Sequence, residues 1–136
     1  MRTGLIKLFK TTNVITSIVG DGTYTNRLPQ EADKDADHII ITQMSSEEHK
    51  SLDGTSELRF IDFDIDCKSP RTSARAGELA AAVRGFLKDY IGAAGDQTIK
   101  AVLFNGESDS FEPPADGSDE GLNVVTLDFN IQYQPV

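Results

Sequence analysis

Ile61-Asp62-Phe63-Asp64-Ile65-Asp66-Cys67-Lys68 alternates strictly between apolar and charged residues. A period of two places the apolar side chains on one face of a β-strand and the charged side chains on the other. Such a strand suits an antiparallel sheet that has one face on a core and the other on water or a polar partner. This stretch therefore predicts an antiparallel sheet covered on one side only.

Further strands are expected on both sides of this stretch. His38–Ser45 is rich in residues that favour strands, and Asp53-Gly54 supplies the turn that joins it to the central stretch as a long hairpin. Thr98–Asn105 is a mostly apolar run, and Leu122–Tyr133 again alternates. A short extended piece, Thr23–Leu28, is a fifth candidate strand.

Two stretches have the apolar spacing of amphipathic helices. The first runs from Leu5 to Val19, and the second carries its apolar stripe from Leu79 to Ile91, with Ser69, Thr72 or Ser73 as its N-terminal cap. We therefore expect an α+β fold with two main helices packed on one mostly antiparallel sheet of four to five strands with a long hairpin. With 136 residues, 1–136 is expected to form a single domain.

The charge balance bears on the class of partner. The formal net charge is −9, which disfavours binding to nucleic-acid phosphates and to anionic lipid. No apolar run is long enough to span a membrane, and no export signal is apparent. A single cysteine, Cys67, excludes an intrachain disulfide, so we expect synthesis in a reducing cytoplasm.

Asp62, Asp64 and Asp66 could at first be taken for the start of a calcium-binding loop. That loop needs a glycine at its sixth position and a glutamate at its twelfth, and here those positions hold Cys67 and Ser73. We therefore predict no metal at these carboxylates. They are instead candidates for contact with a subunit or partner, or for the wall of a channel.

A second acidic segment, 107–121, is predicted to be a flexible loop that contacts a partner protein. It contains two prolines and six acids without one basic residue. The acids are Glu107, Asp109, Glu112, Asp116, Asp119 and Glu120.

Recognisable catalytic motifs are missing from the sequence. There is no serine nucleophile elbow, phosphate-binding loop or zinc-binding His-Glu-x-x-His, and His38 and His49 are the only histidines. The interpretation favoured by the residues is a non-enzymatic protein without catalytic, metal or cofactor residues.

In the order and spacing of its elements the chain resembles the tail-completion, or tail-terminator, proteins of long-tailed bacteriophages. Two features depart from that pattern. Family members often have an aromatic residue just after the arginine, whereas here Tyr24 precedes Arg27. They also often have a proline just before the second strand, where this chain has Asp37-His38. The segments that carry the resemblance are Ile18-Val19-Gly20-Asp21-Gly22, Arg27-Leu28-Pro29, Ile39-Ile40-Ile41, Leu52-Asp53-Gly54, Phe63-Asp64-Ile65-Asp66 and the alanine-rich stretch from Ala74 to Arg84 with Leu87.

The resemblance implies a structural virion protein, made in the host cytoplasm, that forms a homo-oligomeric, hexameric ring at the head-proximal end of the tail tube. There it would stop tube polymerisation and join the tail to the head connector. Its implied partners are the tail tube protein and the connector or neck proteins, and DNA would pass through the channel without specific binding.

Three alternatives remain open at this stage. The chain could be a neck or head-completion protein on the connector side. It could be a small, non-viral ligand-binding domain with the hairpin as a lid. It could also be a cation-dependent enzyme that uses Asp62, Asp64 and Asp66.

Overall fold

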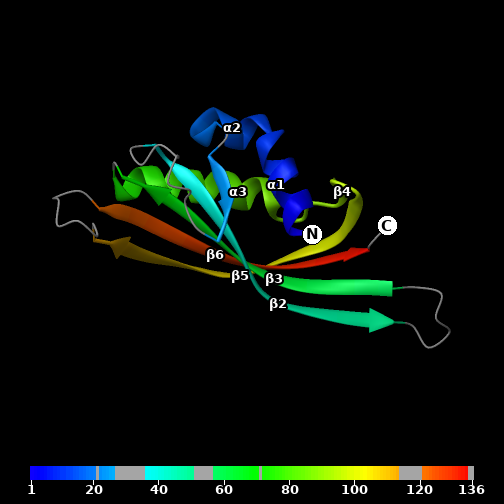
Figure 1. Ribbon diagram of the computed structural model, residues 1–136. Coiled ribbons are helices and arrows are strands. Elements are labelled where there is room, and N and C mark those ends of the chain that lie inside the picture. The colour runs from blue at the N-terminus through cyan, green and yellow to red at the C-terminus, as the bar shows by residue number, and fades with distance from the viewer. Residues whose placement is uncertain (21, 27–35, 51–56, 71, 114–120, 135–136) are drawn as a thin grey trace.

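A computed structural model describes the chain except for residues 21, 27–35, 51–56, 71, 114–120 and 135–136, and gives only the backbone of 45–50 and 57. The described residues form three helices and six strands (Figure 1). In chain order these are α1 (Arg2–Lys10), α2 (Asn13–Val19), β1 (Thr23–Thr25), β2 (His38–Lys50), β3 (Glu57–Ser69), α3 (Ser73–Leu87), β4 (Gly92–Ala94), β5 (Gln97–Glu112) and β6 (Leu122–Gln134).

The six strands form one curled sheet in the order β1-β2-β3-β6-β5-β4. All neighbouring pairs are antiparallel except β1 and β2, which are parallel. The alternating stretch predicted to decide the fold is the middle of β3, and β6 lies beside it, so both regular strands are central. The β2–β3 and β5–β6 hairpins point toward opposite ends of the sheet (Figure 1).

All three helices lie on one face of the sheet (Figure 1). The apolar residues of β3 and β6 face them and are fully or almost fully buried, with Phe63 paired to Phe129 and Ile65 to Leu127. α3 contributes Leu79, Val83 and Leu87 to the same core. The strict alternation in the sequence thus marks the boundary between the core and the opposite, polar face.

The boundaries of α3 follow from its termini. Thr72 is the N-cap, and its hydroxyl accepts a hydrogen bond from the Arg75 N–H at 3.0 Å, which confirms one of the predicted caps. The helix ends at Leu87, because Asp89 takes a left-handed conformation with φ of 62°. The predicted apolar stripe therefore extends too far, and Ile91 lies outside the helix with 70% of its surface exposed.

The first predicted helix is two helices. Thr11 and Thr12 lie between α1 and α2, and their hydroxyls donate to the Lys7 and Leu8 carbonyls at 2.9 and 2.6 Å. These side chains compete with the backbone for hydrogen bonds at the end of α1.

α1 packs closely on β4 at Gly4. A Cβ at this position would overlap the carbonyl oxygen of Ala94, so the close approach requires glycine.

The expected fold class, two helices on four to five mostly antiparallel strands, is wrong. The described residues instead form a mixed, six-stranded, curled half-barrel sheet with three helices. β1 and β4 are three residues each, too short to show a period, and the parallel pairing of β1 with β2 depends on contacts that local sequence does not encode.

Candidate functional site

The polar face of the sheet carries the aspartates that the sequence singled out. Asp62, Asp64 and Asp66 alternate with buried residues of β3, and each is half-buried on the face away from the helices. Asp62 accepts a hydrogen bond from the Asn130 amide at 2.9 Å, and Asp66 accepts one from the Thr126 hydroxyl at 2.7 Å. β6 therefore holds two of the three carboxylates in place.

Asp64 has a different neighbour. Its cross-strand partner in β6 is Asp128, so two carboxylates lie directly opposite each other. The pKa of Asp64 is raised above its ordinary value, first by desolvation and then by the charge of Asp128, with smaller contributions from Asp66 and Asp62. The four aspartates form an acidic row across β3 and β6, which we call the acidic face.

The described residues contain no group of three or more His, Cys, Asp or Glu side chains arranged to hold a metal ion. Cys67 is buried in the core, and burial raises the pKa of its thiol. His38 is 2% exposed, and desolvation lowers the pKa of its imidazole. The side chain of His49 lies outside the described part of the chain.

The predicted acidic loop 107–121 is partly a strand. β5 continues to Glu112, so Glu107, Asp109 and Glu112 belong to the sheet. The prediction failed there because this half of β5 is exposed and polar and lacks the apolar alternation of a half-buried strand. Asp116, Asp119 and Glu120 lie outside the described residues.

The sheet separates two of these acids onto different faces. Glu107 pairs with Arg84 of α3 at 2.9 Å, on the helix side. Glu112 pairs with Lys68 at 2.8 Å, on the side of the acidic face. Both ion pairs are partly exposed and each contributes little to stability. They connect β5 to β3 and to α3.

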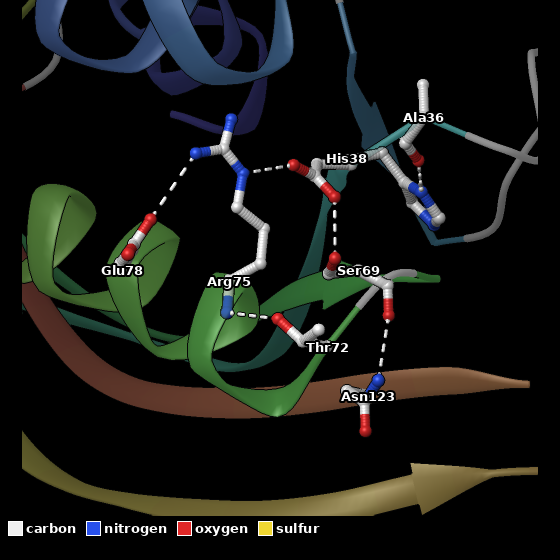
Figure 2. Close-up of polar contacts among 8 residues, drawn as sticks. Ala36, His38, Ser69, Thr72, Arg75, Glu78 and Asn123 are labelled. Carbon is white, nitrogen blue, oxygen red and sulfur yellow. Dashed lines mark hydrogen bonds and ion pairs between the residues drawn. The ribbon is translucent and has the colours of Figure 1, made fainter.

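A buried carboxylate just before β2 contacts Ser69 at the end of β3 and Arg75 at the start of α3, two residues that are labelled in Figure 2. Asp37 is 5% exposed; it accepts hydrogen bonds from the Ser69 hydroxyl at 2.6 Å and from Arg75 Nε at 2.7 Å. Arg75 also contacts Glu78 at 3.3 Å, and the Asn123 amide donates to the Ser69 carbonyl at 3.3 Å. The start of β2, the end of β3 and the start of α3 therefore meet at Asp37.

This cluster is structural in character. Each carboxylate oxygen of Asp37 has a donor within the chain, as a buried charge requires. The hydrogen bond to Asp37 raises the pKa of the Arg75 guanidinium, which is ordinarily already far above neutral pH. Ser69 and Arg75 lie near the start of α3 in the sequence, but none of their neighbours in the chain indicated that Asp37 would be their partner.

The described helices include none that is both long and apolar enough to cross a membrane.

Similarity to a known protein family decides the class of protein. The model of the family described as tail completion protein gp17 matches residues 3–134. The chain belongs to this family.

As a tail completion protein, the chain is a structural component of a bacteriophage-type virion, with a role in completing the tail and joining it to the head. It acts in assembly with other tail and virion proteins. These statements confirm the resemblance found in the sequence.

A solved structure described as the virion of a native gene transfer agent particle contains a chain similar to this tail completion protein. The TM-score is 0.64 at 15% sequence identity, and the match covers 96% of this chain and 91% of the other. At that identity the likeness establishes the fold. No curated protein matches the sequence.

Proposed function

We propose that this tail completion protein forms a closed ring of about six copies at the head-proximal end of the tail tube. Acting as one domain, it ends tube polymerisation and presents a surface to the head connector. Membership of the tail completion family is the observation that carries this proposal. The protein acts without catalysis and without a cofactor.

The acidic face gives the ring a property suited to DNA passage. The chain carries a net charge of −9, so six copies at −9 each carry about −54. Asp62, Asp64 and Asp66 lie on a sheet face that the helices leave uncovered. Facing the channel, these carboxylates repel the DNA backbone, and facing a subunit or virion partner they provide polar contacts.

The pairing of Asp64 with Asp128 supports a role beyond folding. Two carboxylates directly opposite each other destabilise a sheet. Asn130 and Thr126 occupy the corresponding positions beside Asp62 and Asp66, so an uncharged residue is compatible with β6 at that face. A negative surface that serves assembly explains why the charge is present at this unfavourable position.

The acids of 107–121 are proposed as partner contacts. Glu107, Asp109 and Glu112 lie along the exposed half of β5. Replacing Asp116, Asp119 and Glu120 by their amides removes charge without shortening the chain, and we expect weaker tail-to-head joining with unchanged thermal stability.

The proposal is tested by the mass of the purified protein in solution and by electron microscopy after mixing with tail tubes. Rings, or density that caps one end of a tube, support a terminator. A monomer that never contacts tubes overturns the terminator proposal. Decoration of isolated connectors instead of tube ends favours the neck or head-completion alternative.

A further inference from the structure

The outer sides of the long strands β2 and β5 are only partly covered by the short strands β1 and β4. β1 pairs with residues 39–41 of β2, and β4 pairs with residues 97–99 of β5. No described strand pairs with the outer side of residues 42–50 of β2 or of residues 100–112 of β5. Such edges carry backbone N–H and C=O groups that are available for pairing with another strand. Within the described part of the chain the sheet therefore has two long uncovered edges, which we call the free edges.

Two backbone hydrogen bonds at the start of β2 establish which of its residues turn their N–H and C=O groups to the outer edge. Ile39 N–H donates to the Gly22 carbonyl at 2.8 Å, and the Ile41 carbonyl accepts from Asn26 N–H at 3.1 Å. In a strand, every second residue turns its N–H and C=O to the same side. Gln43, the next odd-numbered residue, therefore turns its backbone outward, past the end of β1.

The directions of the long strands make the two edges compatible. β2, β3, β6 and β5 are neighbours in that order, and each adjacent pair is antiparallel. β2 and β5 therefore run in opposite directions. In a cyclic ring all copies have the same orientation along the axis, so β5 of one copy meets β2 of the next in the antiparallel sense.

Two exposed apolar residues lie on these edges at the same level of the sheet. Leu103 of β5 pairs with Asn130, Asn130 pairs with Asp62, and Asp62 pairs with Ser45. Met44 is adjacent, at the register shift between Gln43 and Ser45. Leu103 is 51% exposed and Met44 59%, so both carry apolar surface that a neighbouring strand would cover.

We propose that residues 42–47 of β2 in one copy pair with residues 100–105 of β5 in the next, so that the sheets of all copies join into one closed barrel. This inference rests on the proposed ring and specifies the interface that closes it. β1 and β4 end the pairing at either side, and Met44 packs beside Leu103 of the neighbouring copy. The occupant of each edge is thus a second copy of this chain.

Cysteine cross-linking tests the pairing directly. Adjacent strands lie about 4.8 Å apart, within the Cα separation that a disulfide spans. The double variant Met44→Cys/Leu103→Cys is oxidised in the assembled state and run on a denaturing gel. We expect a ladder of covalent multimers that ends at the ring size. A short bis-maleimide linker in a parallel sample tolerates a shift of two residues in register.

Matched controls isolate the interface. Each single cysteine variant has an introduced thiol on only one of the two edges and should give no ladder. In Val14→Cys/Leu103→Cys the second thiol lies on α2, at a residue that is 54% exposed but away from the edge. The native Cys67 is buried and should not react. A ladder with the Val14 pair as strong as with the Met44 pair overturns the edge assignment.

A backbone variant gives a second test. Gln43→Pro removes an N–H that points outward and breaks no hydrogen bond within the sheet, so it should fold. We expect loss of assembly with an unfolding midpoint close to that of Gln43→Ala, which should still assemble. Assembly by Gln43→Pro at the level of Gln43→Ala counts against pairing at this edge.

The outcomes separate the inference from the proposed function. Rings or tube caps without a Met44–Leu103 ladder, with either reagent, leave the ring standing and overturn the edge pairing. A ladder without rings or caps supports pairing between copies and overturns the closed ring.

Discussion

Replacing Asp64 by Asn should stabilise the isolated protein. Asp64 turns its backbone N–H and C=O toward β2, so its pair with Asp128 is of the non-hydrogen-bonded kind, in which the side chains are closest. Two carboxylates about 5 Å apart repel by roughly 0.8 kcal/mol in a water-like dielectric. Both are half-exposed and can move apart, so we expect Asp64→Asn to gain about 0.5 kcal/mol.

The assay is urea unfolding of a double-mutant cycle at low ionic strength and at a protein concentration where the chain is monomeric. Asp64→Asn and Asp128→Asn should each stabilise the protein, and the double variant should gain little beyond either single variant. Since the Debye length is about 3 Å in 1 M salt, the gain should shrink there. Asp62→Asn, in which the partner Asn130 remains, is the matched control and should not stabilise.

The pH dependence provides a further check. The folded-state pKa of Asp64 is raised above its unfolded value, so the folded state binds the proton more tightly. Stability from this group is therefore fully present below the unfolded pKa and is lost as the pH rises through the folded pKa. The advantage of Asp64→Asn should vanish at pH 3 and be complete at pH 7. Additive gains in the cycle, or a destabilised Asp64→Asn, would refute the repulsion.

Further predictions concern the core and the buried polar residues. Asp37→Ala removes the buried carboxylate that accepts hydrogen bonds from the Ser69 hydroxyl and from Arg75 Nε, and should cost about 2 kcal/mol in urea unfolding. Phe9→Ala, at a fully buried site, should cost about 4 kcal/mol, and Phe86→Ala, at a half-buried ring packed edge-on against Phe9, roughly half of that. Burial lowers the pKa of His38, so its stabilising contribution is present above pH 6.5 and is lost as the pH falls through 6.5 toward the folded pKa. A His38→Gln variant, compared over pH 5–8, should lack that slope.

Local pattern was sufficient for the central strands. The alternation in β3 and β6 assigns each residue to the core or to the polar face, because the side-chain period of a strand is fixed at two. The same pattern located Asp62, Asp64 and Asp66 on one uncovered face. The family was also recognised from the sequence, because the order and spacing of the elements along the chain resemble those of the family even though no catalytic motif is present.

Other features depended on partners distant in the chain. Asp37 lies at the end of a polar run, and its burial follows from the positions of Ser69 and Arg75, more than thirty residues away. The repulsion at Asp64 exists only because β3 and β6 pair in one register, which places Asp128 opposite. Neither effect has a signature in the neighbouring residues.

The sequence by itself determined which face of each long strand is apolar, because side-chain direction is a local property of the backbone. The tertiary structure alone decided the strand order, the parallel pairing of β1 and the extent of the two free edges. Pairing is a contact between distant segments, and its free energy depends on register and packing that no single segment contains.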